Sequence, residues 1–229
     1  MQTRATAPTV MGQQTGAPVG FDLVAERESA TLAWIGEQSA VRLDVIRHLL
    51  GGRAPVSDRT VRHRVECWRR AELVERRRFL AGEPAVVWLT RTGLARVRRP
   101  YRPTVPAVGL LDHLHAVCLV RWGVEAAGGI RWISERALHL TRPTPDAHLP
   151  DGRFRNARGV ETAVEVELTC KGPVRLRHIV DELTVDYDAV LYVVRGARVR
   201  AGVERAVDAL DERNRVTVLD LADFALAPG

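Results

Sequence analysis

The strongest strand signal in this chain is the stretch AVEVELTCKG, residues 163–172, and it decides how the second half of the sequence is interpreted. Apolar and polar side chains alternate along it, as in a strand that buries one face. A strand over Ala163 to Cys170 is therefore expected. The charged face carries Glu165, Glu167, Thr169 and Lys171. The apolar face carries Val164, Val166, Leu168 and Cys170.

Lys171 is the only lysine among 34 lysine and arginine residues. Lysine is a compact charge whose pKa shifts readily on burial, whereas arginine is a rigid fork that stays charged. Two carboxylates and an amine on one face bring repulsion and desolvation, and such a conflict is typical of functional sites. We therefore interpret Glu165, Glu167 and Lys171 as a site. The alternative is an exposed, ion-paired sheet face in which the single lysine is there by chance.

Hard cations such as Mg²⁺ or Mn²⁺ prefer carboxylate oxygens, and Asp146, on an expected short strand over 146–149, offers a third one. The predicted metal ligands are Asp146, Glu165 and Glu167. The predicted catalytic residues are Asp146, Glu167 and Lys171, with the lysine orienting water or stabilising a phosphate.

Three further residues are weighed for this site and given smaller parts. Glu135, at the end of an expected strand, is an accessory candidate. Asp151 ranks below Asp146, because Asp151 and Gly152 are expected to form a turn. His113 is too isolated in the sequence to be assigned as a ligand.

The positive charge of the chain lies in its first half. Residues 1–100 hold 17 arginines against 10 acidic residues, whereas residues 101–229 hold 17 basic against 18 acidic residues. A basic half joined to a neutral half indicates a module that binds a polyanion, attached to a second module.

The first half contains the element order of a winged helix-turn-helix over residues 26–99, after a flexible tail over 1–25. Helices are expected over 26–37, 41–50 and 58–71, followed by a hairpin and a short helix that begins near Thr92. Ser57 is a typical N-cap for the third helix. The buried stripe of that helix is expected to consist of Val61, Val65, Trp68 and Ala71.

Basic side chains concentrate on the third helix and at the start of the hairpin, where such a domain contacts DNA. The predicted DNA-binding residues are Arg59, Arg62, His63, Arg69, Arg70, Arg76, Arg77 and Arg78. If DNA is the partner, affinity falls steeply with salt. Two alternatives are a solvated arginine face and a module that binds proteins.

Residues 100–108 are rich in proline and are expected to link the two domains. Residues 109–229 then show the order α-β-β-β-α-β-α-β, which predicts an α/β sandwich. The expected helices cover 109–127, 174–186 and 199–213. The expected strands are 130–134, 146–149, 163–170, 189–194 and 216–221.

Composition argues against several classes of protein. The three cysteines are widely spaced and odd in number, which argues against a disulfide framework and a zinc site. No apolar leader and no membrane-spanning run is found. We expect a cytoplasmic protein associated with the nucleoid or a plasmid.

The second half resembles the PD-(D/E)XK restriction-endonuclease-like fold, in which a Pro-Asp on one strand and a Glu-x-Lys on the next build a metal site. Pro145-Asp146 matches the first motif, whereas Thr169 stands where Glu167-x-Lys would place the lysine. Together with the winged helix and Trp132-Ile-Ser-Glu-Arg136, the chain resembles the replication-relaxation family of actinobacterial plasmids and integrated elements over residues 26–222. This resemblance implies a two-domain α+β protein with a DNA-associated role in replication, relaxation or transfer.

Two functions follow from these observations. In the first, the protein is a DNA endonuclease or nickase that depends on Mg²⁺ or Mn²⁺. In the second, it is a DNA-binding regulator or replication accessory factor with no catalytic activity. Its nuclease-like domain would then form a homodimer or dock replication or transfer proteins.

Overall fold

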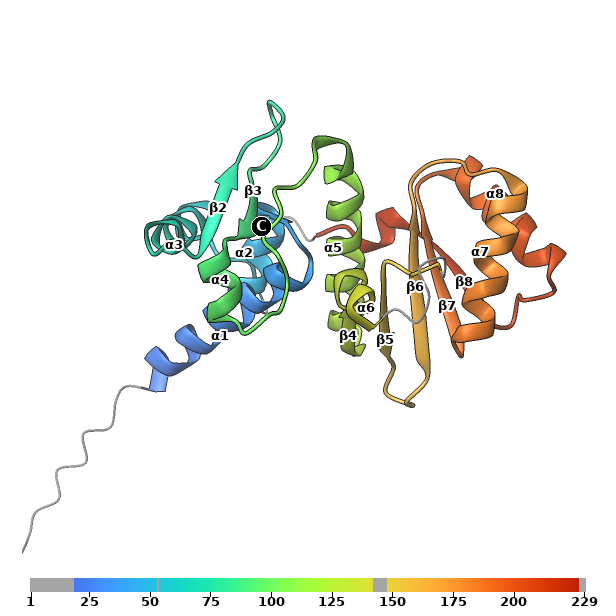
Figure 1. Cartoon of the computed structure of the whole chain (residues 1–229), viewed down its shortest axis with the longest axis horizontal. Helices are drawn as coiled ribbons and strands as arrows, with labels where there is room; N and C mark the ends of the chain where they lie inside the picture. Colours follow the sequence, from blue (N-terminus) through green and yellow to red (C-terminus); the bar gives the residue numbers. More distant parts are fainter. Residues whose placement is uncertain (1–18, 53, 142–147, 227–229) are drawn as a thin grey trace, which may run out of the picture.

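The computed structural model describes residues 19–52, 54–141 and 148–226, and these form a mixed α+β protein with two separate sheets (Figure 1). The N-terminal part, residues 19–99, contains a three-stranded sheet. The C-terminal part, residues 108–226, contains a five-stranded sheet. The predicted mixture of helices and sheets is confirmed. In the described ranges, no helix is both long and apolar enough to cross a membrane.

The N-terminal part follows the predicted order of three helices, a hairpin and a short helix. Its elements are α1 (Val19–Glu37), β1 (Val41–Arg42), α2 (Leu43–Gly51), α3 (Asp58–Arg70), β2 (Val74–Arg77), β3 (Val86–Leu89) and α4 (Arg91–Arg96). The strands are antiparallel in the order β1-β3-β2. Ser57 caps α3 by accepting a hydrogen bond from the Thr60 amide, as predicted. The apolar faces of α1, α2 and α3 meet in one core with the sheet.

Three expectations for this part were wrong. Helix α1 begins at Val19, so residues 19–25 are helical, whereas a flexible tail was expected over 1–25. Residues 1–18 lie outside the described ones, so the tail expected there stays a prediction. Val41 and Arg42 form β1 instead of starting a helix, because they pair with β3. Ala71 is exposed and does not belong to the buried stripe of α3, because the helix has ended before it.

The C-terminal part alternates helices and strands. Its elements are η1 (Val108–Leu110), α5 (Leu111–Ala126), β4 (Ile130–Ser134), α6 (Glu135–Thr141), β5 (Gly152–Arg155), β6 (Glu161–Glu167), α7 (Pro173–Asp186), β7 (Ala189–Val194), α8 (Ala197–Ala209), β8 (Val216–Asp220) and η2 (Leu221–Phe224). The strand order is β4-β5-β6-β7-β8. The β4–β5 and β5–β6 pairs are antiparallel, whereas the β6–β7 and β7–β8 pairs are parallel.

This sheet lies between two helical layers, as Figure 1 shows. Helix α5 packs on one face through Val117 and Val120, which belong to the same cluster as Val164 and Val166 of β6. Helices α7 and α8 pack on the other face, in a cluster that includes Tyr192 of β7. The alternation along β6 therefore sends its valines toward α5 and leaves its glutamates on the side of α7.

The segment between β4 and β6 differs from the prediction. Residues 135–141 form helix α6, where no helix was expected; Ser134 accepts a hydrogen bond from the Ala137 amide at its start. A strand was expected over 146–149, but residues 142–147 lie outside the described ones. The strand of this segment begins at Gly152, where a turn was expected. Glycine is needed there because a β-carbon would overlap the ring of Trp132.

The two parts are joined by buried polar contacts. Glu37 at the end of α1 accepts hydrogen bonds from Tyr101 Oη at 3.0 Å and Ser134 Oγ at 2.9 Å. Trp34 Nε1 donates to Glu125 of α5 at 2.9 Å. Residues 100–107 have no regular secondary structure, in line with their proline content. Hydrogen bonds nevertheless join the parts of the chain that precede and follow them. A domain boundary at residues 100–108 stays a prediction.

Candidate functional site

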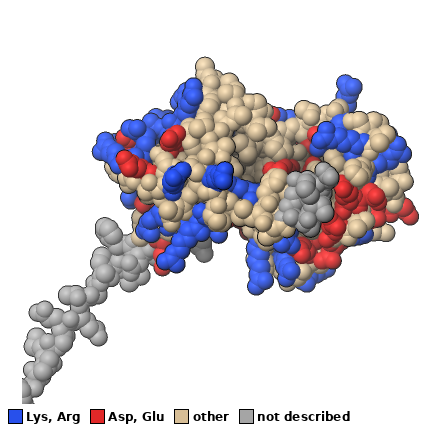
Figure 2. Space-filling model, in the orientation of Figure 1, with Lys and Arg blue, Asp and Glu red and all other residues tan. Residues whose placement is uncertain are grey.

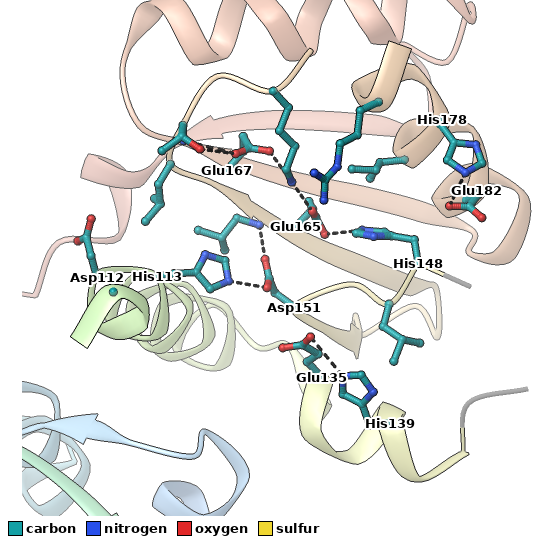
Figure 3. A pocket seen from close by; sticks show the side chains of 18 residues that line it. Asp112, His113, Glu135, His139, His148, Asp151, Glu165, Glu167, His178 and Glu182 are labelled. Carbon is teal, nitrogen blue, oxygen red and sulfur yellow. Dashed lines mark hydrogen bonds and ion pairs between the residues drawn. The ribbon is translucent and has the colours of Figure 1, made fainter. Parts of the chain in front are cut away.

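A cavity of about 690 Å³ lies where β6 ends, between α5, α6 and α7 (Figure 3). Its walls carry both acidic and basic groups. The acidic residues that line it include Glu135, Asp151, Glu165 and Glu167. The basic residues include His113, His148, Lys171 and Arg175. The C-terminal ends of a parallel strand and the adjoining loops are where α/β proteins place binding sites.

Asp151 is held in a fixed orientation beside β6. It directly precedes β5, and its Oδ2 accepts a hydrogen bond of 2.7 Å from the amide of Val166. Its Oδ1 accepts a hydrogen bond of 2.7 Å from His113 Nε2, on the first turn of α5. This bond is the main reason why the pKa of His113 is raised above its ordinary value.

Glu165 lies at the centre of the cavity and is 4% exposed. Its Oε2 is 3.1 Å from His148 Nε2, and its Oε1 is 3.3 Å from Lys171 Nζ. Burial raises the pKa of Glu165, and the charge of Asp151 adds to that effect. Burial opposes a charge on His148, but the hydrogen bond to Glu165 and the charges of Glu165 and Asp151 together outweigh it, so the pKa of His148 is raised.

Lys171 joins the two glutamates of β6. Its Nζ is 2.6 Å from Glu167 Oε2 and 3.3 Å from Glu165 Oε1. Burial opposes the ammonium charge, but the two carboxylates outweigh it, so the pKa of Lys171 is raised. The expected strand over 163–170 was wrong at its end. It stops at Glu167, whose Oε1 accepts a hydrogen bond from the Thr169 amide. Lys171 therefore reaches the carboxylates from a loop.

The predicted site residues have different outcomes. Glu165, Glu167 and Lys171 come together, and both glutamates are buried, so their face is not the exposed sheet surface of the alternative interpretation. Glu135 lines the cavity, where its nearest basic partner is His139 at 3.4 Å. Asp146 lies outside the described residues.

Sequence reasoning missed three groups of the cavity. Asp151 was placed in a turn and ranked below Asp146, although Pro150-Asp151 is a second Pro-Asp pair. His113 was set aside as isolated, and His148 was not singled out. His113 approaches Asp151 from a helix 38 residues away in the sequence. His148 lies close to Asp151 in the sequence, but it belongs to no regular element and no motif that points to it.

A shared metal site is not preformed in the described residues. Among them, no three or more His, Cys, Asp or Glu side chains are arranged to hold one metal ion. The carboxylates contact protein donors instead, with Asp151 bound to His113, Glu165 to His148, and Glu167 to Lys171.

The predicted DNA-binding side chains are all exposed on α3 and the hairpin. Some are already engaged, because Arg69 and Arg70 pair with Glu66 at 3.0 and 3.3 Å, and Arg62 lies 3.6 Å from Asp58. His63 Nε2 lies 3.7 Å from a cysteine of the same helix. Within the described residues, Arg59 and the three hairpin arginines at 76–78 form no ion pair. These four are therefore the most available to a polyanion.

No family model matches the chain, and no curated protein matches it. A lysine and two histidines beside three carboxylates can neutralise an anion and move protons.

Proposed function

We propose that this chain is a DNA-binding protein that hydrolyses phosphodiester bonds at its acidic cavity. The single observation that carries the proposal is the meeting of Asp151, Glu165 and Lys171 in one open cavity of about 690 Å³. Buried groups with shifted pKa values in a cavity are typical of catalytic sites.

The first component of the proposal is DNA binding by a winged helix-turn-helix formed by the N-terminal part. Three helices followed by an antiparallel hairpin support it, because α3 then has the position of a recognition helix. Exposed basic side chains lie on that helix and on β2. Figure 2 shows basic side chains over the end of the molecule that carries α3. Arg59 and Arg77 are proposed as phosphate contacts, because neither forms an ion pair within the described residues.

The second component is a PD-(D/E)XK-like arrangement in the C-terminal part. The order of α5, β4, β5, β6, α7 and β7 supports it, with helix α6 inserted between β4 and β5, and with antiparallel strands followed by parallel ones. Pro150-Asp151 immediately precedes β5, and Glu165-Val-Glu167 follows on the adjacent β6. Glu167 stands where the motif has lysine. The Lys171 ammonium, arriving from the following loop, supplies the missing positive charge.

Metal dependence is a hypothesis of this proposal. The chemistry of the carboxylates fits Mg²⁺ or Mn²⁺, because these ions prefer oxygen ligands. The spacing of the described residues does not fit, because no three of their His, Cys, Asp or Glu side chains surround one point. Asp146 stays a predicted ligand. We assign no step of the reaction to an ion.

The chain's own residues can perform two parts of the hydrolysis. The Lys171 ammonium would donate hydrogen bonds to a phosphoryl oxygen, whose negative charge grows in the transition state. His113 and His148 have raised pKa values, which keep more of each side chain protonated near neutral pH. Either histidine would then protonate the oxygen that leaves.

The test is the incubation of purified protein with supercoiled, linear and branched DNA in Mg²⁺, Mn²⁺ or chelator. We expect nicking or cleavage by the wild type and its loss in Glu165→Gln. Glu182→Gln is the matched control, because Glu182 lines the same cavity from α7 and pairs with His178 instead of Lys171. The proposal fails if the wild type cuts none of these DNAs, or if the two variants cut equally well.

A second candidate function is that of a DNA-binding regulator or replication accessory factor of a plasmid or integrated element. The engagement of Asp151, Glu165 and Glu167 by protein cations or amides favours it, because their charges are then balanced within the protein. This candidate predicts specific binding to a DNA site near the protein's own locus, unaffected by Glu167→Gln. Retention of an end-labelled DNA fragment from that locus, without cleavage, would support it.

A further inference from the structure

Exposed arginines gather early in α7, at the start of α8 and farther along α8, next to the acidic cavity. They are Arg175, Arg177, Arg198 and Arg205. Within the described residues, none of them forms an ion pair. Other arginines of α8 and its neighbouring segments do pair, such as Arg200 with Glu204 and Arg213 with Asp208. Unpaired arginines in one place form a surface that favours an anion.

Two hollows of about 180 and 170 Å³ lie among these arginines, between α7 and α8. Both are lined by Lys171, Leu176, Gly202 and Arg205. Gly202 places no side chain in the groove, and an added β-carbon would lie 3.6 Å from Leu176, at ordinary contact distance. Lys171 also lines the acidic cavity, so the groove and the cavity adjoin at this residue.

We propose that the α7–α8 groove binds single-stranded DNA that extends from the acidic cavity. This inference rests on the proposed function, and it names the substrate as DNA with a single-stranded segment, such as a flap or an unwound origin. The arginines would hold the phosphates, and Lys171 would stand at the entrance from the cavity. Figure 2 shows basic side chains on this end of the molecule beside the acidic ones.

A single strand fits this surface better than a duplex. The groove carries exposed apolar side chains beside its arginines, namely Pro173 and Ala209. A duplex presents only phosphates and sugars to such a surface, whereas a single strand also presents unstacked bases. Bases can lie against apolar side chains and stack on guanidinium planes, which is how sequence-independent single-strand sites work. A single strand also brings fewer phosphates to the adjoining carboxylates.

The groove lies at the opposite end of the molecule from α3 (Figure 1). Basic surfaces therefore flank the acidic cavity on two sides. A duplex held by the N-terminal part and a strand held by the α7–α8 groove would pass the cavity between them. This arrangement predicts preference for a junction of double- and single-stranded DNA.

The test is fluorescence anisotropy with the full chain in chelator, using labelled oligo-dT of about 20 nucleotides and a duplex of the same length. Arg177→Gln/Arg205→Gln removes two groove arginines. The control is the distal arginine pair, Arg131→Gln/Arg158→Gln. These residues are exposed, form no ion pair within the described residues and do not line the groove. Thermal unfolding checks that both variants are folded.

We expect the groove variant to bind oligo-dT about 25-fold more weakly at about 0.1 M salt. For single strands, each lost phosphate contact reduces the slope of log K against log salt by about 0.7. Two lost contacts therefore lower the affinity at about 0.1 M salt by about 1.4 log units if the affinities are equal at about 1 M salt. The distal arginine pair should retain single-strand affinity, and duplex affinity should hardly change in the groove variant. Equal losses in both variants, no loss in either, or an equal loss for duplex would overturn the inference. Chelator prevents metal-dependent hydrolysis, so a failure of the nicking assay leaves this measurement interpretable.

Discussion

Replacement of Lys171 by methionine tests whether one ammonium keeps two buried carboxylates in place. Methionine retains most of the length of lysine but removes its charge. In the wild type, Lys171 Nζ lies 3.3 Å from Glu165 and 2.6 Å from Glu167, and these side chains are 5% and 4% exposed. Lys171→Met would leave two like charges buried without their cation.

The expected loss of stability follows from this burial. Removing one partner of a buried ion pair costs about 3–5 kcal/mol, because the remaining charge is unpaired. The Lys171 side chain is 22% exposed, so solvent screens part of the interaction, and we expect about 2–3 kcal/mol. For a chain of this length each kcal/mol lowers Tm by about 2–4 °C, so Tm should fall by about 4–12 °C.

The loss should depend on pH in a defined direction. Burial already raises the pKa of Glu165 above 4.5, and removal of the ammonium would raise it further. A carboxyl with a raised folded pKa destabilises the folded state fully above that folded pKa, and the effect fades as pH falls from the folded pKa to the unfolded pKa. The Tm difference between wild type and Lys171→Met should therefore be larger at about pH 7.5 than at about pH 5.

Thermal unfolding followed by circular dichroism measures this difference. Arg175→Met is the matched control, because Arg175 lines the same cavity but is exposed and forms no ion pair within the described residues. We expect it to change stability by less than about 0.5 kcal/mol. Adding Glu165→Gln and Glu167→Gln to Lys171→Met should restore much of the lost stability. An unchanged Tm for Lys171→Met at both pH values would refute the reasoning.

Three further predictions concern other parts of the molecule. Arg59→Gln/Arg77→Gln should weaken duplex binding and reduce the magnitude of the slope of log K against log salt by about 1.8. Replacement of the distal arginine pair should change neither quantity, and a salt titration of duplex binding measures both. His113→Asn should lower the free energy of unfolding more at about pH 5.5 than at about pH 8.5. The reason is that the raised pKa of His113 stabilises the fold below pH 6.5, and this stabilisation is lost as pH rises through the folded pKa. Urea unfolding measures the loss at both pH values, and equal losses would show that the interaction with Asp151 is absent. Gly93→Ala should destabilise the folded protein by about 1–3 kcal/mol, because the added β-carbon would overlap a backbone carbonyl oxygen. Gly202→Ala should be nearly neutral, because its β-carbon would have room. Similar Tm values for the two variants would contradict this prediction.

The N-terminal part was largely predictable because its signals are local. The N-cap Ser57, the apolar spacing of Val61, Val65 and Trp68, and the turn at Gly82 each act within a few residues. The pairing of Val41 with Val87 of β3 could not be predicted, because these residues lie far apart in the sequence. Tertiary pairing there overrides a helical pattern.

The candidate site was predictable only along β6. Alternation placed Glu165 and Glu167 on one face, and the lone Lys171 lay close enough to reach them. Asp151 was missed because Gly152–Arg155 is a short, polar strand whose pairing with β6 cannot be seen in its own residues. His113 reaches Asp151 only after α5 packs across the sheet, and that contact spans 38 residues.

The most direct test of phosphodiester hydrolysis at this cavity is the nicking rate of supercoiled DNA by Asp151→Asn compared with Asp112→Asn. Both aspartates line the cavity, but Asp151 contacts His113 and β6, whereas Asp112 pairs with Arg195 at 2.5 Å. We predict that the wild type and Asp112→Asn nick DNA, and that Asp151→Asn loses at least about 100-fold in rate. A wild type that nicks no DNA, or an Asp151→Asn variant as fast as the wild type, would contradict the account.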